Sequence, residues 1–147
     1  MVAPPVRSKW GALHRRMSTA SPWEPCIGYC RAVVCDGWVF VSGTTGTDHA
    51  TGAIPEAVED QCALALRIIE DALREAGASF ADVVRVRYVL PDRADFEPCW
   101  PMLAAAFGAR PPAAIMWEAG LIDPRHRIEI EVTARLPGAT GAAPVAG

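Results

Sequence analysis

The sequence predicts an α+β fold in which a mixed β-sheet carries two helices on one face. Stretches of alternating apolar and polar residues lie on both sides of a long amphipathic segment, residues 56–76. A shorter helical segment, 94–107, lies between two later stretches of the same kind. The predicted order is strand, hairpin, helix, strand, helix, strand, strand. The 147 residues are the length of one domain.

The N-terminal part predicts an extension, a first strand and a hairpin. Residues 1–14 are aperiodic and predict a flexible extension, while residues 15–19 predict a short strand. Residues 21–25 predict a turn with an aromatic anchor. Residues 29–43 predict a β-hairpin, because Asp36-Gly37 is a strong turn signal.

The middle of the chain predicts a helix and a strand. Apolar residues recur at steps of three and four over 56–76, and Gly77 suits a helix C-terminus. Residues 83–90 predict a strand that Pro91 ends. In it apolar residues alternate with arginines: Val84, Val86 and Tyr88 against Arg85 and Arg87.

The C-terminal part predicts a second helix and two strands. Residues 94–107 form the helix, with Pro98 in its first turn and Pro101 as a kink or a later start. Residues 112–117 and 127–132 form the strands. In the last one Ile128, Ile130 and Val132 share a buried face, and Arg127, Glu129 and Glu131 share the other. That other face is either plain solvent or the lining of a cleft. Residues 15–136 are thus the predicted domain, and the small residues of 137–147 predict a disordered tail.

Composition excludes several classes of function. A net charge of −3 without a basic stripe argues against nucleic acid as a partner. No apolar run reaches the roughly 18 residues of a membrane span. The N-terminal residues include prolines and charges where a signal peptide would need an apolar block, so we expect a cytoplasmic protein. The five cysteines lack metal-site spacing and predict reduced, mostly buried thiols. The three histidines are far apart in sequence, so we expect no metal site.

The ordered set of motifs resembles one known family. GYCRAV, DGWVFVSGTTGTD, the long helix, PPAA and IEIEVTA follow one another between residues 21 and 135. In this combination they resemble the reactive intermediate deaminase (Rid, or YjgF type) family. The resemblance implies a homotrimer with a central β-barrel and a ligand cleft at each subunit interface. It also implies hydrolysis of a reactive imine or enamine to a carbonyl compound and ammonia, without metal or cofactor.

Three residues match site positions of that family. Glu129 matches the carboxylate that orients water, which is also what attack on a C=N carbon requires. Tyr29 matches a pocket tyrosine that offers a ring and a hydroxyl, and Gly43 matches a glycine whose backbone approaches the ligand. For Tyr29 and Gly43, interface packing and strand-end geometry are the competing interpretations.

The chain departs from the family at Ala114. Members active on imino acids have an arginine fifteen positions before the matched glutamate, where it clamps the substrate carboxylate. Losing such a pair costs about 2–4 kcal/mol of binding free energy, so a small imino acid is a doubtful substrate. Arg31 and Arg127 are candidate replacements, with an ion pair as the alternative for each. Trp100, Met116 and Trp117 make the neighbouring pocket more apolar. They either fill the cleft, stack on an aromatic ligand, or pack in the core or interface.

The sequence therefore predicts a Rid-type imine or enamine deaminase of a subgroup without the arginine, with an altered substrate range. Its predicted substrate-binding residues are Tyr29, Gly43, Ala114, Met116, Trp100 and Arg31. One alternative is a non-catalytic trimer that binds a small metabolite or a partner protein in the same cleft. A ring-forming or ring-opening catalyst is a further alternative, which ammonia release would distinguish.

Overall fold

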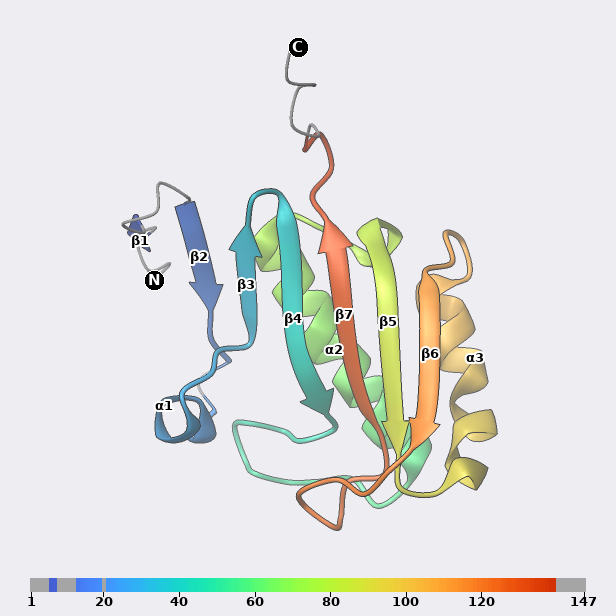
Figure 1. Ribbon diagram of the computed structural model, residues 1–147. Coiled ribbons are helices and arrows are strands. Elements are labelled where there is room, and N and C mark those ends of the chain that lie inside the picture. The colour runs from blue at the N-terminus through green and yellow to red at the C-terminus, as the bar shows by residue number, and fades with distance from the viewer. Residues whose placement is uncertain (1–5, 8–12, 20, 140–147) are drawn as a thin grey trace.

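The described residues of the computed structural model, 6–7, 13–19 and 21–139, form one sheet with two helices behind it. The strand order is β1-β2-β3-β4-β7-β5-β6. Helices α2 and α3 cover the same face of the sheet (Figure 1). The predicted α+β class is confirmed. The strands are β1 (Val6–Arg7), β2 (Leu13–Met17), β3 (Ala32–Cys35), β4 (Trp38–Thr45), β5 (Val83–Leu90), β6 (Ala113–Glu118) and β7 (Glu129–Arg135), and the main helices are α2 (Val58–Ala76) and α3 (Phe96–Phe107).

The turn predicted at Asp36-Gly37 is confirmed. Strands β3 and β4 form an antiparallel hairpin, and Asp36 and Gly37 at its turn have φ angles of 50° and 79°. Two consecutive positive φ angles suit the right-handed twist of the hairpin. Strand β2 pairs with β3, and the two-residue β1 pairs with β2. The rest of the predicted extension and most of the predicted tail, residues 1–5, 8–12 and 140–147, lie outside the described residues.

The turn predicted at residues 21–25 is wrong. A short helix, α1 (Trp23–Ile27), follows Pro22, and Gly28 ends it with a φ of 89°. Trp23 is 64% exposed, so it is not a buried anchor. The segment is held instead by Glu24, whose buried carboxylate accepts hydrogen bonds from Thr19.

Helix α2 supplies the centre of the core. Its apolar stripe is buried against the sheet, and Gly77 ends it at a φ of 91° while donating to Arg74 and Leu73. The predicted helix and its C-cap are therefore confirmed. The fully buried side chains of the core include Ile69 and Leu73 of α2, Val39 and Val41 of β4, and Ile130 and Val132 of β7.

Strand β7 lies in the middle of the sheet. It pairs antiparallel with β4 on one side and with β5 on the other, while β6 pairs parallel with β5 at the edge. Its predicted alternation is confirmed: Ile130 and Val132 are buried, and Glu129 and Glu131 face the other side. The alternation predicted for β5 fails at Val84, which is 42% exposed. The β5–β7 register shifts between Val83 and Arg85, and Val83 is the buried residue.

The second helix tolerates both prolines. Pro98 is in the first turn of α3, as predicted, and Pro101 lies inside the helix rather than before it. The prediction of mostly buried cysteines is wrong. Cys62 and Cys99 are buried between the helices, whereas Cys26 is exposed and the other two are half-buried; all five thiols are free.

Apolar side chains remain exposed on the edge strand β6 and on the open face of the sheet. All six residues of β6 are exposed, and they include Ile115, Met116 and Trp117. Trp38 and Phe40 of β4 are 37% and 48% exposed. Exposed apolar surface of this kind marks an association surface. Of the helices that the structure describes, none has the length and apolarity to cross a membrane.

Candidate active site

Glu129 is the first residue of β7, opposite Thr45 of β4 and Val89 of β5. Its side chain lies on the face of the sheet away from α2, and the residue is half-buried. Burial raises the pKa of this carboxyl, the charge of Arg31 opposes that rise, and Glu131 adds to it. The net effect is a pKa above the ordinary value. A carboxyl with a raised pKa can accept a proton from water and return it at neutral pH.

Gly43 provides the space that this carboxylate occupies. The register between β4 and β7 shifts between Val41 and Thr44, so β4 is irregular at residue 43. A β-carbon on Gly43 would overlap Oε1 of Glu129. The structure thus brings two predicted site residues into direct contact, and it gives the glycine a steric reason.

Arg31 lies immediately beside them and is almost completely buried, with 3% of its surface exposed. Its Nη1 donates to the carbonyl of Gly43 at 3.0 Å and to Oγ1 of Thr44 at 2.9 Å. The prediction that Arg31 lies within the first strand of the hairpin is wrong, because β3 begins one residue later. Its backbone N–H donates to Met17 at 2.8 Å, and its carbonyl accepts from Ser42 at 2.9 Å.

Tyr29 shares this region. The guanidinium carbon of Arg31 lies 5.8 Å from the centre of the Tyr29 ring. Ser42 Oγ donates to the carbonyl of Cys30 at 2.6 Å, which ties the segment before β3 to the irregular part of β4. Tyr29, Gly43, Arg31 and Glu129 therefore form one group, which we call the β4–β7 cluster.

Glu24 is a further residue of this region, and no pattern in the sequence points to it. Its carboxylate accepts from the N–H of Thr19 at 3.0 Å, from Thr19 Oγ1 at 2.8 Å, and from Ser18 Oγ. Burial alone raises its pKa, but these hydrogen bonds and the charge of Arg31 bring the pKa below the ordinary value. Glu24 is thus an anion whose charge interacts favourably with that of Arg31. No spacing pattern connects residues 24 and 31, so only the fold reveals the pair.

A hollow of about 310 Å³ adjoins Arg31 on the helix side of the sheet. Its lining residues are Met17, Ser18, Thr19, Arg31, His49, Ile68, Asp71, Ala72 and Glu75. Burial lowers the pKa of His49, and the charge of Arg31 lowers it further. The lining thus contains two carboxylates, Asp71 and Glu75, together with the imidazole of His49 and the guanidinium of Arg31.

The remaining predicted site residues lie elsewhere. Ala114 and Met116 are on β6, which β5 and β7 separate from β4. They pair with Val86 and Tyr88, whose side chains are buried on the helix side, while Glu129 is on the opposite face. A single chain does not bring these residues to the β4–β7 cluster.

Trp100 is also remote from the cluster within one chain. It is on α3, behind the sheet edge, and is 52% exposed. Its ring meets that of Phe96 edge-on, with centres 6.1 Å apart. Trp117 of β6 is 42% exposed. Both tryptophans thus lie on the side of the molecule that carries Ala114.

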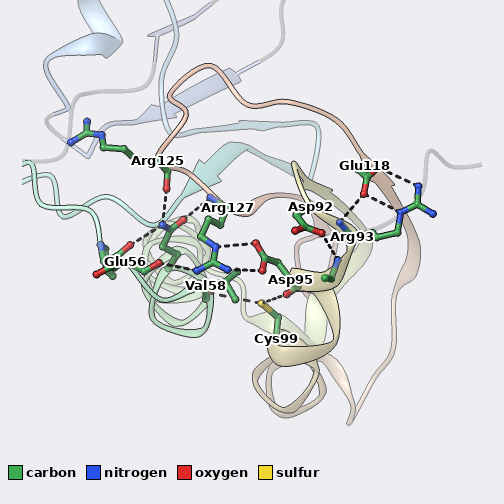
Figure 2. Close-up of polar contacts among 12 residues, drawn as sticks. Glu56, Val58, Asp92, Arg93, Asp95, Cys99, Glu118, Arg125 and Arg127 are labelled. Carbon is green, nitrogen blue, oxygen red and sulfur yellow. Dashed lines mark hydrogen bonds and ion pairs between the residues drawn. The ribbon is translucent and has the colours of Figure 1, made fainter.

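Arg127, the other candidate replacement, is engaged in an ion pair. Its Nε and Nη2 donate to the two carboxylate oxygens of Asp95 at 2.9 and 2.7 Å, and Nη1 donates to the carbonyl of Glu56 at 3.1 Å (Figure 2). Asp95 is 8% exposed. This two-pronged pair joins the start of α3 to the segment before β7, so Arg127 has a structural role.

The residues described include no group of three or more histidines, cysteines or acidic residues placed to hold a metal ion. The ring nitrogen Nε2 of His126 forms a hydrogen bond with Thr47 Oγ1 at 2.8 Å. What the β4–β7 cluster offers is a half-buried carboxyl, a buried guanidinium, a phenol and backbone at a glycine. Such a set can orient water and move a proton.

The chain is similar to proteins whose names describe imine chemistry. Residues 19–136 match the family described as Endoribonuclease L-PSP. The chain is 30% identical over 122 residues to the 2-iminobutanoate/2-iminopropanoate deaminase of Rattus norvegicus, covering 82% of this chain and 89% of that protein. It is 33% identical over 109 residues to the chloroplastic Reactive Intermediate Deaminase A of Arabidopsis thaliana. That match covers 74% of this chain and 58% of the relative's length.

A solved structure supports the same relationship. A member of the YjgF/YER057c/UK114 family from Mycobacterium tuberculosis has a TM-score of 0.76 and 37% identity, with 84% of this chain and 99% of that chain covered. The matched family region extends from before α1 to the end of β7 and so includes the whole β4–β7 cluster. The chain therefore belongs to the reactive intermediate deaminase family, also called the YjgF or L-PSP family.

Proposed function

We propose that this protein hydrolyses a reactive imine or enamine to a carbonyl compound and ammonia. The observation that carries the proposal is the contact between the Glu129 carboxylate and Gly43, beside the buried Arg31. Relatives about 30% identical are named as deaminases of 2-iminobutanoate and 2-iminopropanoate, which supports the reaction class.

The reaction needs one water and no electron transfer. In the proposed mechanism Glu129 orients a water against the C=N carbon and accepts a proton as the C–O bond forms. The proton then passes to the nitrogen, which gives a carbinolamine. The carbinolamine hydroxyl transfers its own proton to the nitrogen by way of the same carboxylate as the C–N bond breaks, so ammonia leaves and the carbonyl forms. The raised pKa of Glu129 suits a group that takes up and returns the same proton. Tyr29 is proposed to contact the substrate with its ring and hydroxyl, and Gly43 with its backbone.

The complete cleft is proposed to lie between subunits of a homotrimer with a central β-barrel. Within one chain the β4–β7 cluster and the β6 residues Ala114 and Met116 lie on opposite faces and different parts of the sheet. A site that uses both therefore needs two copies. The exposed β6 edge and the apolar side chains Trp38 and Phe40 on the open face support such an assembly.

The substrate range is proposed to differ from that of the imino-acid deaminases. Ala114 offers no charge where a carboxylate clamp is expected, and Met116, Trp100 and Trp117 supply exposed apolar surface nearby. A subgroup without the arginine would depend less on a substrate carboxylate and would accept bulkier, aromatic side chains. Arg31 could contact a substrate only through the part of its guanidinium that Gly43 and Thr44 leave unused.

The test is ammonia and carbonyl release from imines that an amino acid oxidase generates from alanine and from phenylalanine. We expect wild type to accelerate hydrolysis, with the phenylalanine imine preferred, and Glu129→Ala to abolish the acceleration while sedimentation still gives a trimer. Glu70→Ala, on the exposed side of α2, is the control for loss of a carboxylate. A wild type that accelerates neither imine, but binds a metabolite in the cleft, would favour the non-catalytic alternative.

A further inference from the structure

Arg31 is a buried charge that the proposed hydrolysis does not use. Only 3% of its surface is exposed, and its Nε is a buried nitrogen without a hydrogen-bond partner among the described residues. Burying a cation is unfavourable unless nearby groups compensate it, and the anion of Glu24 supplies part of that compensation. Because Arg31 lies beside the candidate catalytic carboxyl, its burial there calls for an explanation.

The contacts of Arg31 lead to Glu129 through Gly43. Nη1 donates to the Gly43 carbonyl at 3.0 Å and to Thr44 Oγ1 at 2.9 Å, at the point where the β4–β7 register shifts. The missing β-carbon of Gly43 is what leaves room for the carboxylate of Glu129. Arg31 thus fixes the carbonyl of the residue against which Glu129 rests.

The charges that face Glu129 are few. On its own strand, Glu131 disfavours ionisation of Glu129. Its neighbours across the sheet, Thr45 of β4 and Val89 of β5, are uncharged. Arg87 of β5 lies 3.9 Å from Glu131, with which it pairs. Arg31 is the cation, within the described part of the chain, that favours the carboxylate form of Glu129.

We propose that Arg31 is a positioning residue that fixes the irregular backbone at Gly43 and Thr44 and keeps Glu129 ionised until water delivers its proton. The role rests on the proposed hydrolysis for its chemistry, but the effect on Glu129 exists without substrate. Arg31 is not a substitute for the substrate clamp. Nη1 is already engaged twice, and the hollow on its other side has Asp71 and Glu75 in its lining, which disfavours an anionic ligand there.

The first experiment compares pH profiles of kcat/KM for the alanine-derived and phenylalanine-derived imines. In Arg31→Met the acid limb moves to higher pH for both imines, because Glu129 has lost its stabilising cation. In Arg31→Lys the acid limb stays close to wild type while kcat falls, because an ammonium keeps the charge but not the planar donor geometry. Arg74→Met, on the exposed side of α2, leaves the profile unchanged.

A different pattern would overturn the proposal. If Arg31→Met and Arg31→Lys raise KM for both imines but leave kcat and the acid limb where they are, Arg31 binds substrate and does not act through Glu129.

The second experiment needs no turnover. The Glu129 carboxyl is titrated by NMR in protein labelled with ¹³C at glutamate, and its signal is identified by its loss in Glu129→Gln. Its pKa rises in Arg31→Met, and in Arg31→Lys it stays near wild type. An unchanged Glu129 titration in Arg31→Met overturns the inference, whereas an inactive wild type with the expected titration overturns only the proposed hydrolysis. If Arg31→Met does not fold, Arg31→Ala and the milder Arg31→Gln give the same comparison.

Discussion

The carboxylate of Glu129 occupies the position that a β-carbon of residue 43 would take. The neighbouring atom is the far end of a side chain, so the carboxylate can turn away and the fold can adjust. The relationship between the two residues therefore concerns catalysis more than stability.

Gly43→Ala is expected to lower kcat by about 10-fold to 100-fold, because displacement of a catalytic group by about 1 Å has effects of that size. The thermal midpoint should change little. Steady-state rates and thermal unfolding of the same preparations check both. Gly120→Ala is the matched control, since a β-carbon there meets nothing within 4 Å. A fully active Gly43→Ala would contradict the placement of Glu129.

Gly46→Ala is expected to show the opposite pattern. A β-carbon at residue 46 would lie 2.5 Å from both Cα and the carbonyl oxygen of Gln61, which are backbone atoms of α2 and cannot turn away. We expect a loss of about 1–3 kcal/mol in the free energy of unfolding. Urea denaturation of Gly46→Ala and Gly43→Ala side by side measures the difference, and equal stabilities would refute the assignment.

Glu129→Gln is expected to make the protein more stable at neutral pH. Burial raises the pKa of Glu129 above its unfolded value, so its contribution to stability is present below the unfolded pKa and is lost as pH rises through the folded pKa. Glutamine stays neutral, so the variant does not lose stability when the pH rises through the pKa of Glu129. The melting temperature of the variant should exceed that of wild type at about pH 8 and approach it at about pH 4. A constant difference across this range would disprove the assignment.

Asp95→Ala is expected to destabilise the fold by about 1–2 kcal/mol, because Arg127 loses both bonds of its pair while part of its side chain remains solvated. Asp123→Ala, which removes the partner of the exposed Arg125, should cost less than about 1 kcal/mol. Chemical denaturation at one pH compares the two. A larger loss in Asp123→Ala would show that burial does not decide the strength of these pairs.

Local patterns were enough to predict most of the fold. The Asp36-Gly37 turn, the α2 stripe with Gly77, and the alternation of β7 depend on neighbours in sequence, and all three are confirmed. The exposure of Val84 was not predicted, because a one-residue irregularity in β5 reverses which side chains face the core. Periodicity alone cannot locate such a shift. Helix α1 is held by Glu24, whose partners lie outside it.

The site was less predictable than the fold. Glu129 and Gly43 came from a resemblance, and the sequence held no sign that one side chain fills the space above the other. The burial of Arg31 depends on where the chain crosses between β2 and β3, which residue spacing does not determine. The position of Ala114 at a sheet edge depends on strand order, which arises from pairing between distant segments.

The place of β7 between β4 and β5 affects how the protein is made. Strands β4 and β5 are synthesised first, yet they touch each other only through a strand that comes later in the chain. In a nascent chain that ends before residue 129, the strands can form only two separate groups, β1 to β4 and β5 with β6. Helix α2 then has no continuous sheet to pack against. Because Glu129 begins the strand that joins them, closure of the sheet and arrival of the carboxyl happen in the same step of synthesis. Truncated chains would lack a continuous sheet and the proposed active-site carboxyl together.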